Sequence, residues 1–152
     1  MSDSYEILGT DYIQLIVGNA KQAKHFYQTQ FGFEPIAYKG LETGDREKTE
    51  YVLKQNKITL LLTTPLTPKS PLNEHLRLHG DGVKDVAFWV TDAKDAWEVT
   101  TSKGAKSVRE PETIEDENGK ITLAAIQTYG DTIHTFVERN NYNGIFMPGY
   151  VK

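Results

Sequence analysis

Val17-Gly-Asn-Ala-Lys-Gln-Ala23 is repeated later in the chain as Val90-Thr-Asp-Ala-Lys-Asp-Ala96. Each copy follows a short run of apolar residues and precedes a segment whose apolar residues recur with helical spacing. Asn19 in the first copy and Asp92 in the second are residue types that cap the start of a helix. The repeat therefore indicates the same strand-to-helix junction in two copies of one module.

The residues around the first copy predict the element order βαβββ. Residues 12–17 alternate between two faces, with Ile13, Leu15 and Val17 on the face that a helix would cover. The helix after Asn19 should end at Gly32, because glycine readily adopts the left-handed conformation that ends helices. Further strands are predicted at 33–38, 48–54 and 57–63. The expected apolar stripe of the helix consists of Ala20, Ala23, Phe26 and Tyr27.

The residues around the second copy predict the same order again. A strand at 83–90 leads to a helix that is capped by Asp92 and should end at Gly104. Three further strands are predicted at about 105–113, 119–128 and 132–139, and Trp89 and Trp97 are interpreted as packing residues. The first strand should carry Val86, Phe88 and Val90 on one face and Asp85, Ala87 and Trp89 on the other.

Together these patterns predict an α+β fold in which two βαβββ modules in tandem form a curved mixed sheet with helices on the outside. The whole chain, 1–152, is expected to be a single domain of ordinary size. Module one covers about 11–64, a connector with one brief helix covers 65–82, module two covers about 83–140, and a C-terminal tail covers 141–152.

Composition excludes several classes of protein. Lys plus Arg total 17 against 21 Asp plus Glu, a net charge of −4, so no basic surface for nucleic acid is expected. The chain has no cysteine, which excludes disulfide scaffolds, thiolate metal sites and cysteine nucleophiles. Residues 1–12 lack the pattern of a signal peptide, and apolar runs such as Val86 to Val90 are too short to span a membrane. These features predict a cytoplasmic protein.

Several short motifs are interpreted as structural. His75 and His79 have the i, i+4 spacing of a zinc clip, but no third ligand is spaced to complete a site, so a solvated pair is predicted. His25 is expected on the helix surface. The segment His79-Gly-Asp-Gly precedes a strand, whereas phosphate loops follow one, so it is interpreted as a turn. No Gly-x-Ser-x-Gly elbow is present, which argues against hydrolase chemistry.

Motifs throughout the chain resemble one family. From about Thr10 to Tyr150 the sequence is similar to the N-terminal half of 4-hydroxyphenylpyruvate dioxygenases, members of the vicinal-oxygen-chelate superfamily with a glyoxalase/dihydroxybiphenyl-dioxygenase-like fold. Besides the first copy of the repeat, the matching motifs are Phe31-Gly-Phe-Glu-Pro35, Gly40-Leu-Glu-Thr-Gly44, His79-Gly-Asp-Gly-Val-Lys-Asp85, Gln127-Thr-Tyr-Gly-Asp131 and Met147-Pro-Gly-Tyr150.

The resemblance implies an activity for a longer parent protein. The parent would convert 4-hydroxyphenylpyruvate, a small aromatic 2-oxo acid, and O₂ to homogentisate and CO₂ in tyrosine catabolism. Its Fe(II) would be bound by the C-terminal catalytic half, which is absent from these 152 residues. That half is the expected partner of this chain, alongside further copies in a homo-oligomer, and the chain alone is predicted to be inactive.

The same resemblance places the superfamily's metal ligands on the first strand of each module and on a last strand. The corresponding first-strand positions hold Tyr12 and Asp85, neither of which is the histidine of a facial triad. Module one's last strand offers Thr59 and Leu61, or Ile58, Leu60 and Leu62, depending on the face. A partial set of Asp85, His134 and Glu138 is conceivable in module two. The prediction is nevertheless that this chain contains no catalytic, cofactor-binding or metal-binding residue.

Two alternatives remain open. The chain could be half of a hydroxymandelate synthase, a relative that uses the same substrate and iron, or a free-standing superfamily member that binds a small ligand. A half cut from its partner should expose an apolar patch and self-associate.

Overall fold

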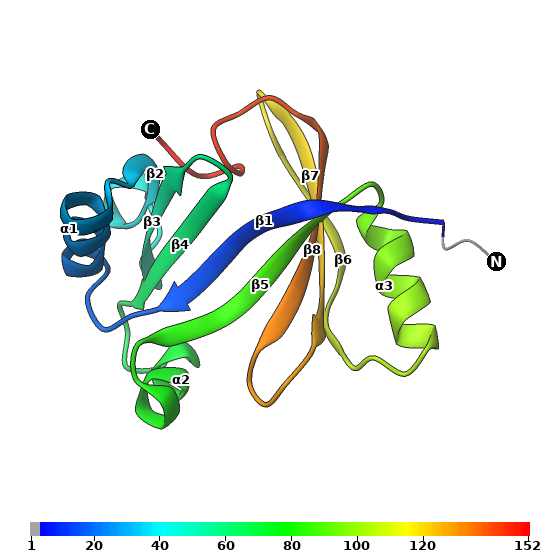
Figure 1. The fold of residues 1–152 in the computed structure, drawn as a ribbon, viewed down its shortest axis with the longest axis horizontal. Coiled ribbons are helices and arrows are strands. Elements are labelled where there is room, and N and C mark those ends of the chain that lie inside the picture. The colour runs from blue at the N-terminus through cyan, green and yellow to red at the C-terminus, as the bar shows by residue number, and fades with distance from the viewer. Residues whose placement is uncertain (1–3) are drawn as a thin grey trace. The chain divides into compact units, whose positions relative to one another are not determined.

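The computed structural model describes residues 4–152, which form two compact units (Figure 1). The α1 unit comprises Ile13–Lys84 with Gly149–Lys152. The α3 unit comprises the chain up to Tyr12 together with Asp85–Pro148. The expectation that no signal peptide is present rests partly on residues 1–3, which lie outside the described residues.

In the α1 unit, one helix covers a mixed sheet with the strand order β2-β3-β4-β1. Strand β1 runs parallel to β4, with Ile13 opposite Leu60, while β2–β3 and β3–β4 are antiparallel. Figure 1 shows α1 against one face of these strands. The elements are β1 (Ile7–Ile16, of which Ile13–Ile16 belongs to this unit), α1 (Ala20–Phe31), β2 (Glu34–Lys39), the 3-10 turn η1 (Leu41–Thr43), β3 (Lys48–Gln55), β4 (Ile58–Pro65) and α2 (Leu72–His79).

In the α3 unit, the strand order is β1-β5-β8-β7-β6, and only the part of β1 up to Tyr12 belongs to it. Strands β5 and β8 are parallel, whereas β7 is antiparallel to both β8 and β6. Helix α3 packs against β6, β7 and β8. The elements are β5 (Gly82–Val90, of which Asp85–Val90 belongs to this unit), α3 (Ala93–Ser102), β6 (Ser107–Asp116), β7 (Gly119–Gln127) and β8 (Ile133–Tyr142).

The repeated motif forms the same junction in both units, as its sequence predicts. In the first copy, the Asn19 side chain accepts a hydrogen bond from the Gln22 amide at 3.0 Å. The amide of Ala20 donates to the Thr64 hydroxyl on the last strand of the module at 2.7 Å. Gly32 ends the helix with a φ of 77°, in the left-handed region that favours glycine. Amides of the first helical turn thus find acceptors in both the capping residue Asn19 and the last-strand residue Thr64.

The second junction repeats this arrangement with charged acceptors. The Asp92 side chain accepts from the Asp95 amide at 2.9 Å, and the amide of Ala93 donates to Glu138 at 3.0 Å. Ala93 and Glu138 occupy the positions that Ala20 and Thr64 hold in the first copy. The second module therefore also ties the start of its helix to its last strand.

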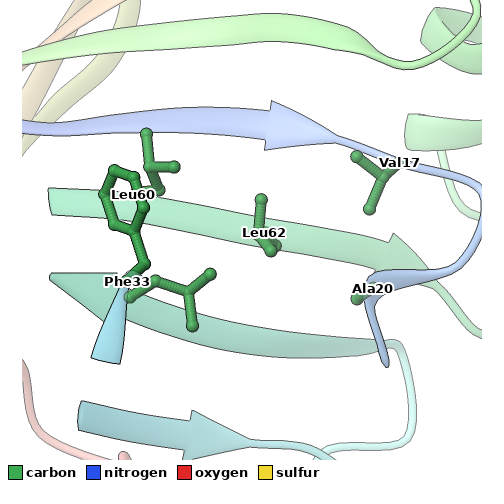
Figure 2. Packing of buried hydrophobic residues seen from close by; sticks show 6 residues of the cluster. Val17, Ala20, Phe33, Leu60 and Leu62 are labelled. Atoms are coloured by element: carbon green, nitrogen blue, oxygen red, sulfur yellow. The ribbon is translucent and has the colours of Figure 1, made fainter. Parts of the chain in front are cut away.

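Each unit has its own apolar core between helix and sheet. Figure 2 shows that Leu60 and Leu62 project from β4 on the same side of the sheet as Val17, Ala20 and Phe33, with which they form one core cluster. In the α3 unit the corresponding cluster contains Val90, Ala93, Ala96, Ala124 and Phe136, with Phe88 and Trp97 packed against it. These contacts confirm the predicted helix-facing side of the first strand in module one and the predicted α+β fold of two βαβββ modules, and they show that α3 covers the Phe88 and Val90 side of β5.

One aromatic residue of α1 differs from its predicted placement. Phe26 was expected on the buried stripe of α1, but half of its surface is exposed. It packs edge-on against Tyr27 and Phe31 at the outer side of the helix. Trp89, interpreted as a packing residue, exposes 37% of its surface, whereas Trp97 contacts the core of the α3 unit. Among residues 4–152, no helix has the length and apolar character needed to cross a membrane.

Candidate functional site

A buried polar cluster occupies the α3 unit on the side of β5 opposite helix α3. It consists of Tyr12, Asp85 and Thr135, which are 7%, 2% and 5% exposed. The Asp85 carboxylate accepts hydrogen bonds from the Tyr12 hydroxyl at 3.1 Å and from the Thr135 hydroxyl at 2.5 Å. It also accepts a bond from the Thr135 backbone amide at 3.0 Å. One carboxylate thus joins side chains from three strands.

Strand alternation explains why these residues meet. Val90 and Phe88 of β5 face the core beneath α3, so Asp85, an odd number of residues away, points to the opposite face. Strand β8 runs parallel to β5, and Phe136 also belongs to the core. Its neighbour Thr135 must therefore share the face of Asp85. Period-two alternation thus brings the threonine and the aspartate together.

The environment shifts the pKa values of two members of the cluster. Burial raises the pKa of Asp85 above its ordinary value of 3.8, although the hydrogen bonds from Thr135 and Tyr12 favour the charged carboxylate and act against this rise. Burial, followed by the negative charge of Asp85, raises the pKa of Tyr12 well above 10.0. The phenol therefore remains protonated and serves as a donor to Asp85.

The donor set of this cluster does not fit Fe(II). A facial triad needs two imidazoles and one carboxylate with room for further ligands. Here one carboxylate stands beside a phenol and an alcohol, and both hydroxyls donate hydrogen bonds to that carboxylate. Within residues 4–152, no group of three or more His, Cys, Asp or Glu side chains is placed to hold a metal ion.

The conceivable metal set of Asp85, His134 and Glu138 is wrong, because the structure does not bring these residues together. His134 stacks on Phe88 and its Nδ1 lies 2.8 Å from the Val86 carbonyl, on the face that helix α3 covers. Glu138 lies on that same side, where it accepts the bond from Ala93. Asp85 points to the other face. The β8 residue that contacts Asp85 is Thr135, which was not predicted from the sequence.

The remaining histidines give a mixed outcome. His25 is exposed on α1, as predicted. His75 and His79 lie with their ring centres 4.8 Å apart on α2, but the prediction of a solvated pair is wrong because His75 is only 8% exposed. In module one, Leu60 and Leu62 face the core and leave Thr59 and Leu61 on the opposite side of β4.

An open groove of about 610 Å³ lies beside helix α3 and strands β6 and β7. Its lining includes the carboxylates of Asp92, Glu98, Glu110 and Glu138, together with Trp97 and the ammonium group of Lys94. The carboxylates outnumber the lysine, so the net negative charge of the lining disfavours anions. The groove is therefore poorly suited to a 2-oxo acid, and it lies on the helix side of β8, away from Asp85.

Two findings connect this chain with known families. The family model described as Glyoxalase/Bleomycin resistance protein/Dioxygenase superfamily matches residues 9–132. The 4-hydroxyphenylpyruvate dioxygenase of Tetrahymena thermophila is 47% identical over 151 residues, covering 96% of this chain and 37% of the relative. That of Xenopus tropicalis is 49% identical over 145 residues, covering 94% of this chain and 37% of the relative. The expected resemblance is thereby confirmed.

The chain spans between 37% and 41% of the length of the six curated relatives compared. Among solved structures, a variant of 4-hydroxymandelate synthase from Streptomyces coelicolor is similar with a TM-score of 0.83 and 26% identity, over 93% of this chain and 42% of that one. Methylmalonyl-CoA epimerase from Mycobacterium tuberculosis has a TM-score of 0.71 and 20% identity, over 91% and 92% of the two chains. The latter likeness concerns the fold.

We predict that Asp85→Ala lowers the free energy of unfolding by about 3 kcal/mol, because the hydroxyls of Tyr12 and Thr135 lose a buried acceptor. Asp85→Asn should lower the free energy of unfolding by less, and it should remove the dependence of this free energy on pH that Asp85 causes. Between 3.8 and the raised folded pKa of Asp85, the folded chain binds more protons than the unfolded chain, so stability falls as the pH rises through this window.

Urea unfolding across this pH range, followed by tryptophan fluorescence, measures both effects. Glu115→Gln makes the same carboxyl-to-amide change at an exposed position of β6 and should leave the profile of the parent chain intact. If Asp85→Ala were as stable as the Glu115 control, Asp85 would have no structural role.

Proposed function

Because this chain belongs to the Glyoxalase/Bleomycin resistance protein/Dioxygenase superfamily, we propose that it forms the N-terminal, non-metal part of a 4-hydroxyphenylpyruvate dioxygenase. In the longer protein, 4-hydroxyphenylpyruvate and O₂ are converted to homogentisate and CO₂ as a step of tyrosine catabolism. Fe(II) is bound by the C-terminal part. The observation that carries the assignment is identity of 44–49% over nearly the whole chain to relatives with this activity in their names.

The Asp85 cluster supports the non-metal role. The hydroxyls of Tyr12 and Thr135 both donate to the single carboxylate of this cluster. A metal ion would have to displace these bonds and would gain only weak neutral ligands in exchange. This part of the protein therefore serves as a scaffold that packs against the catalytic part, and it has no catalytic, cofactor-binding or metal-binding residue of its own.

The function is tested by comparing the 152-residue chain with the longer protein that contains it. With Fe(II), ascorbate and 4-hydroxyphenylpyruvate, the longer protein should consume O₂ and release homogentisate, whereas the isolated chain should match a metal-free control. Oxygen consumption by the isolated chain would refute the scaffold role, and no turnover by the longer protein would refute the assignment.

One alternative has a specific observation in its favour. The similarity to 4-hydroxymandelate synthase, at 26% identity and a TM-score of 0.83, would fit a longer protein that hydroxylates the side chain of the same substrate. The higher identity to dioxygenases favours homogentisate. Chromatography of the product from the same assay separates the two, because hydroxymandelate and homogentisate differ in the position of the new hydroxyl group.

We further propose that the protein is a cytoplasmic homo-oligomer. The absence of cysteine supports the compartment. The exposed aromatic rings of Phe26 and Phe31, whose centres lie 5.7 Å apart, support contact with another protein surface. Light scattering should show self-association of the isolated chain, reduced by Phe26→Gln with Phe31→Gln but not by Val108→Gln, an equally exposed apolar residue on β6. A monomer at high concentration would contradict this proposal.

A further inference from the structure

A second buried carboxylate, Glu50 of β3, lies in the α1 unit and is only 1% exposed. Its Oε2 accepts a hydrogen bond from the Thr63 hydroxyl at 2.7 Å, and its Oε1 lies 3.1 Å from the ammonium group of Lys48. The same Oε1 accepts a bond from the hydroxyl of Tyr150 at 2.7 Å. Tyr150 belongs to the C-terminal segment Gly149–Lys152, which is part of the α1 unit although the residues before it belong to the α3 unit.

The repeat identifies the equivalent position in the other unit. Ile16 pairs with Thr63 on the neighbouring strand, and Glu50 in turn lies opposite Thr63. Trp89, which corresponds to Ile16 through the repeated motif, pairs with Val137. Leu123 in turn lies opposite Val137. The pair Glu50–Thr63 in the α1 unit therefore corresponds to Leu123–Val137 in the α3 unit.

This comparison shows that the module does not need a carboxylate here. Leu123 is 4% exposed and Val137 is fully buried, so an apolar pair fills the same place. A buried carboxylate must be compensated by hydrogen bonds or a counter-charge, whereas two apolar residues need no such compensation. In the α1 unit, Glu50 is compensated by the ammonium group of Lys48 and by the phenol that the C-terminal segment supplies.

Backbone contacts hold the same segment. The amide of Tyr38 donates to the Val151 carbonyl at 2.7 Å, and the Val151 amide donates to the Tyr38 carbonyl at 2.9 Å. These two bonds form an antiparallel bridge on β2. The ammonium group of Lys39 lies 5.6 Å from the ring centre of Tyr150, within the range of a cation–π contact. Main-chain pairing and a specific side-chain contact are together the features of strand addition to a sheet edge.

We propose that the α1 unit contains a docking site for an extended, phenol-bearing peptide, and that Glu50 is its positioning residue. Its ligand is the chain's own segment Gly149–Lys152. In the longer dioxygenase, docking of this segment fixes where the chain leaves the α1 unit and in which direction it continues toward the catalytic part. This role rests on the proposed function.

Hydrogen exchange in the 152-residue chain tests the docking without any turnover, so its failure is distinguishable from failure of the proposed function. Tyr150→Phe removes only the hydroxyl that donates to Glu50. We expect the Val151 amide to exchange about tenfold faster in this variant, because the bridge then opens more often. Tyr129→Phe makes the same change at a tyrosine that is 88% exposed and should leave this rate as it was.

A second variant separates docking from folding. Glu50→Leu with Thr63→Val installs the apolar pair that the α3 unit already uses, so the module should keep its fold by circular dichroism. The Val151 amide should then exchange as fast as in an unstructured peptide. If it stayed protected in both this double variant and Tyr150→Phe, Glu50 would not position the segment and the proposal would be overturned.

Discussion

The carboxylate of Asp85 is the acceptor on which the interior of the α3 unit depends. It joins β5 to β1 through Tyr12 and to β8 through both the hydroxyl and the amide of Thr135. Burial alone would make such a charge costly, and the three donors supply what water no longer provides. The same hydrogen bonds also disfavour metal binding at Asp85, because donors that satisfy a carboxylate compete with any cation for its oxygens.

The two modules share a scaffold but use their sheets differently. Both tie the start of the helix to the last strand, through Thr64 in one copy and Glu138 in the other. The two modules differ on the face of the sheet opposite the helix. The α3 unit buries Asp85 in an internal network, whereas the α1 unit buries Glu50 against the C-terminal segment. Neither Asp85 nor Glu50 belongs to the helix-facing core of its unit, so the two modules can share that core while differing on the other face.

Local patterns predicted the fold well, since capping and strand alternation depend on near neighbours. Asn19 and Asp92 were identified as caps for this reason. Placements that depend on tertiary contacts could not be predicted in this way. The face of His134 depends on which side of β8 the helix covers, and the burial of His75 depends on how α2 lies against β4. Glu50 gave no signal in the sequence, because its partner Tyr150 lies 100 residues away.

Metal binding by the isolated chain tests whether the hydrogen bonds of Asp85 keep a metal ion out of this cluster. Crystals soaked in Fe(II), and separately in Zn(II), can be measured by anomalous diffraction. We expect no anomalous peak beside Asp85, and unchanged hydrogen bonds from Tyr12 and Thr135 to its carboxylate. A metal peak about 2.0–2.2 Å from an Asp85 oxygen, held by side chains of this chain, would contradict this expectation.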